Sequence, residues 1–425
     1  MRFRISTILF FLLVALSFVY VNSRKEKDNS HVFMALIFPF IIPLTMLFFE
    51  DLEIFPKIIL YSMFLFPILI FALPIIYLII HDKNDSSKTS FHTKWKKEWS
   101  LRLSAPKNFP INGEFCQVYD KNDTEIASYK FMQYDQGMGY DLSYKTKEAM
   151  GSGTPKYVDI SCYALAERTK YTANIEFNEE EHAIIKQHFD EGYEGQSSHQ
   201  LYESFGICCL PGGQLKFHLF GIARCICLDF DRQCKMVRER RKEWERTMDF
   251  TQDVPYGLWD KYFHRYNYTF KVIFDEPKEL SIYYEYPQFT NGEFYKRSFN
   301  ENPTNYITNP SIVRNYSFRW VENGSHYECT LFFNENNILQ TFEKAFLEHP
   351  NEEAILQINV GTERYNYNVS LNIEQQSYKL SSIEYIVWKL NLKDKYSYGW
   401  VEYCNYCEKK GKHKSYDFKN HFMGF

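Results

Sequence analysis

Hydrophobic and polar residues alternate loosely from residue 171 to 177, and the spacing then becomes helical as far as residue 189. The first part carries β-branched and aromatic residues, which favours a half-buried strand. In the second part Ile184, Ile185 and Phe189 fall close to one face of a helix. The pattern therefore predicts a strand that leads directly into a short helix.

Asn178 stands where the spacing changes, and its side chain is suited to cap the helix by accepting a backbone hydrogen bond. Glu181 follows three residues later, as in a capping box. The run from Glu179 to Glu181 has two interpretations. It is either an acidic catalytic or metal cluster, or a first turn whose charges complement the helix dipole.

A near-copy of this stretch occupies residues 331–346. Asn334 takes the cap position, and Ile338, Phe342 and Phe346 are spaced by four, as on one helical face. The copy keeps the cap and the apolar face but has no run of glutamates at its start. A duplicated catalytic cluster would need those carboxylates twice, so we interpret the repeated stretch as architecture.

A second landmark, Asn-Gly-Glu-Phe, occurs at residues 112–115 and again at 291–294. Asn-Gly predicts a two-residue hairpin turn, because both central positions favour positive φ. The two landmarks keep their order, but the first copy has 23 more residues between Gly113 and Asn178 than the second has between Gly292 and Asn334. We assign the extra residues to a long loop within residues 130–155. The repeated order indicates an internal duplication, with chance similarity in an aromatic-rich chain as the alternative.

Each copy returns to β structure after its helix. Residues 205–210 and 214–220 flank Pro211-Gly212, which predicts a type II turn and a hairpin. Residues 354–360 and 364–373 flank Gly361 in the same way. The predicted fold class is α+β, with N-terminal transmembrane helices followed by two related antiparallel-sheet units, each with a packed helix.

The first 80 residues contain three apolar runs without charged residues, at 5–21, 32–49 and 58–80. Each is close to the roughly 20 residues that cross a bilayer. The alternative for the first run is a cleaved signal peptide, introduced by Arg2 and Arg4. Transporters usually need ionisable residues inside such runs. We therefore expect an anchor of two or three helices that contacts the lipid bilayer through residues 5–80.

The positive residues set the expected orientation. With three spans, a cytoplasmic C-terminal region places eight of the lysines and arginines flanking the runs inside and three outside. The soluble region is therefore predicted to be cytoplasmic, or periplasmic if the first run is cleaved. The expected organisation is an anchor at 1–81, a linker at 82–94, a first α+β unit at 95–230, a helical connector at 231–267, and a second α+β unit with a C-terminal tail at 268–425.

The connector is basic, but glutamates interleave with its lysines and arginines, which is typical of a solvated helix. No nucleic-acid partner is expected. The net charge of −4 is too small to indicate a class of partner. The aromatic content of 18% favours β structure. The 10 cysteines do not follow the spacing of a secreted disulfide scaffold.

One candidate metal site stands near the C-terminus. Cys404 and Cys407 form a Cys-x-x-Cys pair, and His413 and His421 would complete four zinc ligands. The alternatives are a redox pair, which would need a thioredoxin-like βαβ context that the sequence does not have, and an unliganded pair near a frayed C-terminus. Cys225 and Cys227 are expected to be small core residues, and His182 and His188 to lie on the surface. No phosphate-binding loop, Rossmann fingerprint, HExxH or GxSxG sequence is present, and no catalytic residue is assigned.

Several short segments between residues 95 and 268 share a family pattern. They are Trp99 with Ala105-Pro106-Lys107-Asn108-Phe109-Pro110, Leu165-Ala166-Glu167, Leu210-Pro211-Gly212-Gly213, and Leu258-Trp259-Asp260-Lys261-Tyr262 with Arg265-Tyr266. Together they resemble an uncharacterised bacterial envelope family, the domain-of-unknown-function family 2931, and the second copy resembles it only weakly. The resemblance implies no activity and no catalytic residues. Members are often lipoproteins, whereas this chain has no cysteine before Cys116.

These observations lead to two hypotheses of function. The first is a non-enzymatic binding or scaffold protein in the bacterial inner membrane, with a protein partner. The second is a membrane-tethered hydrolase or metal-dependent enzyme whose site lies between the two units. An exposed aromatic patch would favour the first, and a pocket with convergent polar groups would favour the second.

Overall fold

The computed structural model describes residues 98–134, 150–195, 199–237, 253–275, 280, 282–300, 302–362, 366–390, 400–404, 422–423 and 425. The chain divides into two compact units, Met1–Trp95 and Lys96–Phe425, and all described residues belong to the second. The three apolar runs lie outside the described residues. Among the helices that are described, none has the length and apolar character needed to cross a membrane.

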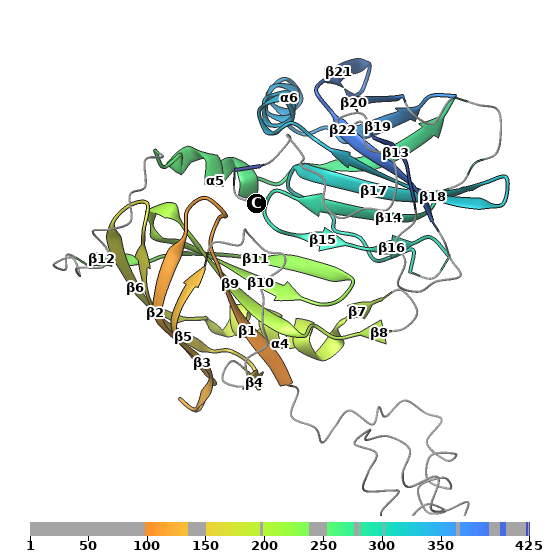
Figure 1. Cartoon of the computed structure of the whole chain (residues 1–425). Helices are drawn as coiled ribbons and strands as arrows, with labels where there is room; N and C mark the ends of the chain where they lie inside the picture. Colours follow the sequence, from red (N-terminus) through yellow and green to blue (C-terminus); the bar gives the residue numbers. More distant parts are fainter. Residues whose placement is uncertain are drawn as a thin grey trace, which may run out of the picture. The chain divides into compact units, whose positions relative to one another are not determined.

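The N-terminal half (residues 98–237) is mostly β, with one α-helix in its described part (Figure 1). Its elements are β1 (Glu98–Ser104), β2 (Ile111–Tyr119), β3 (Glu125–Tyr134), β4 (Met150–Ser152), β5 (Tyr157–Ala164), β6 (Thr169–Glu176), α4 (Glu179–Glu191), β7 (Tyr193–Glu194), β8 (His199–Gln200), β9 (Ser204–Leu210), β10 (Gln214–Phe220), β11 (Arg224–Gln233) and β12 (Lys235–Val237).

Helix α5 (Tyr256–Phe263) leads into the C-terminal half (residues 268–404), which is also mostly β. Its elements are β13 (Tyr268–Phe274), β14 (Ile282–Phe289), β15 (Phe294–Tyr295), β16 (Arg297–Ser298), β17 (Val313–Glu322), β18 (Ser325–Phe332), α6 (Glu335–Glu348), β19 (Ala354–Val360), β20 (Tyr367–Ile373), β21 (Gln376–Leu380), β22 (Glu384–Leu390) and β23 (Trp400–Cys404). The α+β class is confirmed: the described residues are mostly β, with three α-helices.

The two halves pair their strands in the same order. In the N-terminal half β1 pairs in parallel with β9, β10 and β11 follow as antiparallel neighbours, and β2, β5 and β6 form a second ladder. In the C-terminal half β13 pairs in parallel with β19, β20 and β21 follow, and β14, β17 and β18 form the second ladder. The parallel pairs correct the expectation of purely antiparallel sheets. In each half the helix lies in the connection between the first strand and the strand that pairs in parallel with it, which are β1 and β9 in one half and β13 and β19 in the other.

One sheet continues through both halves. Its strand order is β23-β22-β18-β17-β14-β15-β11-β10-β9-β1-β4. The halves meet where β11 pairs with β15, with Arg224 opposite Tyr295 and Cys225 opposite Phe294. The separate sheets β12-β6-β5-β2-β3 and β13-β19-β20-β21 belong to one half each.

The N-terminal half has its own aromatic core. Helix α4 contributes Ile185 and Phe189, both buried, and the Phe189 ring stacks on Trp99 with 5.9 Å between ring centres. The cap is the one expected from the sequence. Glu181 N donates to Asn178 Oδ1, and Asn178 N donates to a Glu181 carboxylate oxygen, both at 2.9 Å. The predicted capping box is therefore confirmed.

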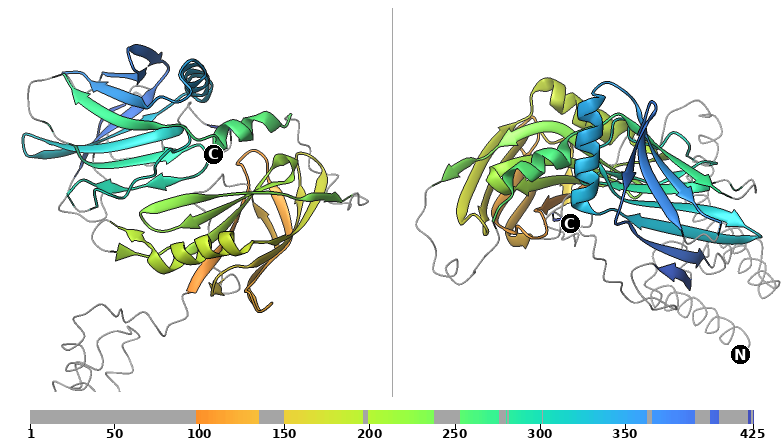
Figure 2. Two further views of the ribbon diagram at one scale, coloured as in Figure 1. Left: turned by 180° about the vertical axis from the view of Figure 1, so that it is seen from behind. Right: turned by 90° about the horizontal axis from the view of Figure 1, so that it is seen from above.

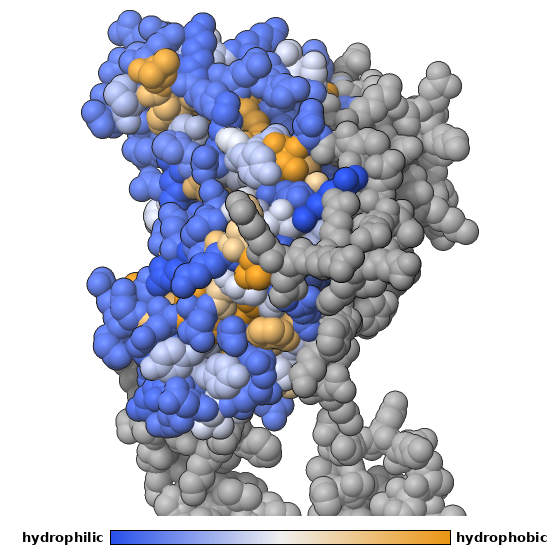
Figure 3. Space-filling model, turned by 90° about the vertical axis from the view of Figure 1, so that its left-hand side faces the viewer, coloured by the Kyte–Doolittle hydropathy of each residue, from blue (hydrophilic) through white to orange (hydrophobic). Residues whose placement is uncertain are grey.

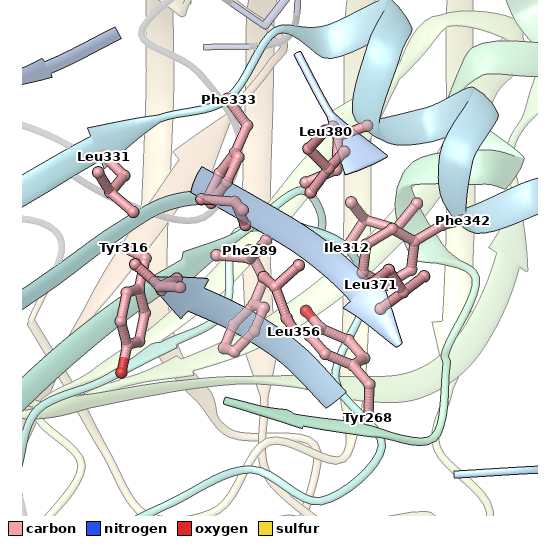
Figure 4. Close-up of a cluster of buried hydrophobic side chains, with 14 of the residues drawn as sticks. Tyr268, Phe289, Ile312, Tyr316, Leu331, Phe333, Phe342, Leu356, Leu371 and Leu380 are labelled. Carbon is pink, nitrogen blue, oxygen red and sulfur yellow. The ribbon is translucent and has the colours of Figure 1, made fainter. Parts of the chain in front are cut away.

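The C-terminal half has a larger core, part of which is drawn in Figure 4. Helix α6 buries Ile338 and Phe342 there, and it lies against β20 and β21 (Figure 2). Asn334 Oδ1 accepts a hydrogen bond from Asn337 N at 3.1 Å, as predicted for its cap. The repeated strand–Asn–helix stretch thus has the same structure in both halves.

The Asn-Gly sequence forms a turn in only one of its two copies, and that turn is not the predicted two-residue turn. Asn291-Gly292 lies between the end of β14 at Phe289 and the start of β15 at Phe294, and of the pair only Gly292 has positive φ, at 86°. Asn112 and Gly113 instead lie inside β2, which pairs with β3 on one side and β5 on the other. Pairing on both edges keeps this backbone extended, so the predicted turn is wrong there. By contrast, Pro211-Gly212 forms the predicted turn, with Gly212 at φ 84°.

The prediction of a helical connector is wrong at its start. β11 continues to Gln233 and β12 occupies Lys235–Val237, where it pairs with β6. Leu228 and Phe230 are buried and alternate with exposed Asp229 and Asp231, which is the period of a strand. Residues 238–252 lie outside the described residues, and α5 is the helix expected near residue 258. The long loop assigned to residues 130–155 also contains strand, because β3 reaches Tyr134 and β4 begins at Met150.

Candidate interaction site

The loop between β16 and β17 carries two exposed aromatic side chains. Phe299 is 38% exposed and Tyr306 is 44% exposed. We call residues 299–312 the aromatic loop. Where Figure 3 shows the surface, it is mainly hydrophilic, with hydrophobic residues in a few separate groups. Aromatic side chains are enriched at the centres of protein interfaces, so this loop is the first place to look for a partner.

Arg297 organises the two rings. The centre of its guanidinium lies 4.5 Å from the centre of the Phe299 ring and 5.6 Å from that of Tyr306, within cation–π range. The guanidinium is held in place by an ion pair with the buried Glu285, with 2.6 Å between Nη2 and Oε1. Arg297 therefore acts as a fixed support for both rings.

Glu285 is itself fixed by two tyrosines. The hydroxyls of Tyr295 and Tyr316 each donate to a Glu285 carboxylate oxygen at 2.9 Å. Burial, together with the neighbouring carboxylate, raises the pKa of both phenols well above the ordinary value, so they remain neutral donors. Glu285 is thus a buried anion with three donors, which suits a structural role.

Two buried asparagines fix the backbone of the aromatic loop. Asn302 Oδ1 accepts from Ser298 N, and Asn302 Nδ2 donates to Lys296 O at 2.9 Å. Asn305 Nδ2 donates to Lys296 O at 2.8 Å and to Ala223 O at 3.3 Å. A loop that is fixed before binding loses little conformational entropy when a partner arrives.

The contact with Ala223 brings a third apolar residue close to the loop. Lys296 N donates to Ala223 O at 2.8 Å, and Ile222, the preceding residue, is one of the most exposed hydrophobic side chains described. We call Phe299 and Tyr306 the aromatic patch. The β10–β11 turn of the N-terminal half, which carries Ile222, supports the loop of this patch through Ala223 O.

Lys296 gives this region a positive neighbour. Its ammonium lies 5.2 Å from the centre of the Tyr286 ring and 6.0 Å from that of Phe294. Burial lowers the pKa of Lys296, and the nearby charge of Arg319 lowers it further. The surroundings of the patch are therefore aromatic and cationic.

Three of the four residues of the proposed zinc site lie outside the described residues. Cys404 ends β23, while Cys407, His413 and His421 lie outside the described residues. Within the described part of the chain, no group of histidine, cysteine and carboxylate residues is arranged to hold a metal ion. The zinc site therefore stays a prediction.

The glutamates at the start of α4 make ion pairs that tie the helix to the sheets. Glu179 Oε1 accepts from Lys156 Nζ at 2.8 Å, and this hydrogen bond lowers the pKa of Glu179. Glu181 accepts from Arg232 of β11 at 2.5 and 2.7 Å. His182 and His188 are half-buried, which corrects the expectation of surface positions, and burial lowers the pKa of both. Both paired carboxylates have structural partners.

Eight cysteines of the described structure, from Cys116 to Cys329, are buried and unbridged. Cys225 and Cys227 lie in β11, as expected of small core residues. Burial raises the pKa of Cys208 and of Cys234 to about 12. These thiols are therefore protonated at neutral pH and are poor nucleophiles.

Several of the segments that form the family pattern meet around Glu167. Its Oε1 accepts the N–H of Gly212 at 2.9 Å and the hydroxyls of Tyr171 and Tyr256 at 3.0 Å. Nearby, Leu165 N donates to Pro110 O at 3.1 Å. The carboxylate thus joins the β5–β6 turn, the β9–β10 turn and the start of α5. The role of these family segments is therefore structural, because their hydrogen bonds hold the turns in fixed positions relative to one another.

Part of the chain matches a known protein family. The model described as "Protein of unknown function (DUF2931)" matches residues 84–255. Residues 84–255 form a DUF2931 domain. Neither a curated protein nor a solved structure matches the chain. The resemblance seen in the sequence is confirmed, but the DUF2931 match ends before α5, so the segment at 258–266 lies outside it.

The aromatic patch was missed by sequence reasoning. Phe299 and Tyr306 belong to an aromatic-rich chain in which neither residue stands out. A weak signal was present in residues 300–305, five of which are polar, because they interrupt the apolar pattern between two strands. Only the structure shows that Asn302 and Asn305 turn inward while the aromatic rings stay exposed. The patch also lies outside the DUF2931 domain, in the C-terminal half.

Proposed function

We propose that this protein is a non-enzymatic, membrane-anchored binding protein of the bacterial inner membrane, and that its aromatic patch contacts a partner protein. The anchor is the block of apolar runs within residues 5–80. The DUF2931 domain and the C-terminal half together form the binding part. The observation that carries the proposal is the pair of exposed rings of Phe299 and Tyr306 on a loop fixed by buried hydrogen bonds.

The energetics of the loop support this choice. Exposing a large aromatic ring to water brings no stability, because its apolar area stays hydrated. The chain nevertheless uses Asn302, Asn305 and Arg297 to keep the two rings in place. Such fixed rings serve recognition, since fixed aromatic side chains cover a large contact area at small entropic cost.

The common order of strands in the two halves supports a scaffold that arose by duplication. Both halves share a strand pairing order, a capped helix in the same position and a hairpin after it. We infer that the C-terminal half is a diverged copy of the DUF2931 domain. In this view the aromatic loop is an elaboration of the copy, and the shared elements provide the rigid base for it.

Site-specific photo-crosslinking tests the binding function. The full chain, in the membranes of the cells that produce it, receives a benzoyl-phenylalanine at Tyr306 or, as a control, at Leu347, which is 83% exposed on α6. We expect a discrete protein adduct from position 306 that disappears when Phe299→Ala is added. No adduct, or an adduct that persists in Phe299→Ala and also forms from position 347, contradicts the proposal.

A further inference from the structure

The end strand of one sheet has a hydrogen-bonding edge that no described strand covers. This edge begins after Tyr266, whose N–H donates to Pro310 O at 3.0 Å. β13 is the terminal strand of the sheet β13-β19-β20-β21. Its partner β19 runs parallel to it, and the pairing begins with Tyr268 opposite Ala354 and ends with Phe274 opposite Val360. Ala354 N donates to Asn267 O, and Asp275 N donates to Val360 O, both at 2.9 Å. The odd-numbered residues of β13 therefore bond to β19.

The direction of backbone groups alternates along a strand, so the even-numbered residues point the other way. The N–H and C=O groups of Phe270, Val272 and Phe274 are thus directed to the side of β13 opposite β19. No other strand in the described part of the chain pairs with β13. An exposed row of this kind is a template for an added strand.

The N-terminal half shows what occupies this position in the DUF2931 domain. β1, which pairs in parallel with β9, has β4 on its other edge, running antiparallel with Trp99 opposite Gly151. Trp99 Nε1 also donates to Gly153 O at 2.7 Å. β4 lies in the segment by which the first copy is longer. Between β14 and β17 the described short strands pair with β14 and β11 instead.

The side chains of β13 hold the strand in place and give it a preference for a negatively charged partner. Phe270 stacks on Tyr316 at 4.5 Å between ring centres, so the strand is held from the core side. On the opposite face Thr269 and Lys271 are exposed. Lys271 makes no ion pair with any described residue, so a carboxylate opposite it would gain a partner.

We propose that the open edge of β13 binds an extended segment of a partner protein, antiparallel to β13, with an acidic residue beside Lys271. The orientation follows that of β4 on β1. A second copy of this chain is the poorer occupant, because β13 paired antiparallel with itself about Lys271 would place two lysines opposite each other. The inference does not depend on the aromatic patch.

Two capped nine-residue peptides of alternating threonine and valine serve as probes, one with a central glutamate and one with a central lysine. Binding to the purified full chain is measured by fluorescence polarisation of a labelled peptide. We expect the glutamate peptide to bind at least tenfold more tightly than the lysine peptide. Equal affinity for the two peptides, or no binding of either, overturns the proposal.

Two variants locate the binding. Val272→Pro removes one outward N–H and leaves the ladder to β19 intact, since proline is tolerated on the open side of an edge strand. It should weaken binding at least tenfold. Lys271→Glu, which leaves the backbone unchanged, should reverse the preference between the peptides.

Matched controls separate this proposal from the proposed function. Lys379→Glu changes an exposed lysine on β21, the opposite edge of the same sheet, and should leave binding unchanged. Phe299→Ala should do so as well, because the aromatic patch is a different surface. Binding that survives both Val272→Pro and Lys271→Glu would show that the peptide does not use the β13 edge. Neither outcome of the peptide experiment changes the adduct expected in photo-crosslinking from Tyr306, so the two proposals can fail separately.

Discussion

The guanidinium of Arg265 contacts both carboxylate oxygens of Glu293, with 3.0 Å from Nη1 to Oε2 and 3.1 Å from Nη2 to Oε1. Arg265 follows α5, and Glu293 stands in the turn between β14 and β15. The same carboxylate accepts Cys227 N from β11 at 2.8 Å. This pair therefore joins the two halves where their common sheet passes from one to the other.

Removing Arg265 should cost far more stability than removing its exposed partner. The side chain of Glu293 is 2% exposed, whereas that of Asp229, which also pairs with Arg265, is 75% exposed. Arg265→Ala leaves a buried carboxylate without its cation, so we expect a loss of about 3–5 kcal/mol. Asp229→Ala should cost about 1 kcal/mol or less. Urea unfolding of the two variants measures the difference, and equal losses would contradict a structural role for the pair.

His218 should make the protein less stable in mild acid. It is buried in β10, its Nε2 lies 2.8 Å from Asn291 O, and burial lowers its pKa, with the charges of Lys216 and Arg265 acting in the same direction. The folded pKa is thus below the unfolded value of about 6.5. As the pH falls through that value, the unfolded chain takes up the proton first, and stability decreases.

The variant His218→Gln tests this pH dependence. Glutamine can still donate to Asn291 O but does not titrate, so its loss of stability between pH 7.5 and pH 5.5 should be smaller than that of the wild type. The half-buried His182 and His188 are present in both proteins and cancel in the comparison. An unchanged pH dependence in His218→Gln would rule out the assignment.

The parts of the fold that depend on local chemistry were predictable from the sequence. Asn178 and Asn334 cap their helices because the hydrogen bonds involved lie within one turn. Pro211-Gly212 turns because proline fixes φ and glycine accepts positive φ. Such features need no knowledge of distant partners.

Features that depend on distant partners were not predictable. Asn112-Gly113 carries a strong turn signal, but β3 and β5 pair on both sides of it and keep it extended. The charges near Arg232 suggested a helix, whereas pairing and the ion pair with Glu181 hold a strand there. The aromatic patch was hidden for the same reason, since its shape depends on Ala223, a residue of the other half.

The buried thiols should be unreactive until the protein unfolds. With eight described cysteines buried, we expect Ellman's reagent at pH 8 to modify at most Cys404 and Cys407 in the native chain. The double variant Cys404→Ser/Cys407→Ser should show no rapid reaction when native and eight thiols in denaturant. Rapid modification of any further thiol in the native chain would contradict the burial of this set.

The same assay tests the zinc prediction. Zinc bound by Cys404, Cys407, His413 and His421 would protect the two cysteines from the reagent, and EDTA would restore their reaction. Protection should be lost in His413→Ala and His421→Ala. If zinc leaves the reaction of Cys404 and Cys407 unchanged, the four residues do not form a zinc site.

Asn302 should couple the stability of the aromatic loop to its binding function. Asn302→Ala leaves Ser298 N without its acceptor and Lys296 O without one of its donors in a buried position. We expect a loss of about 1–3 kcal/mol in the free energy of unfolding, together with a weaker photo-crosslink from position 306. Asn300→Ala changes an exposed neighbour and serves as the control. If Asn302→Ala lowers stability yet leaves the crosslink at full strength, then a fixed loop is not what the partner requires, and recognition rests on the two rings alone.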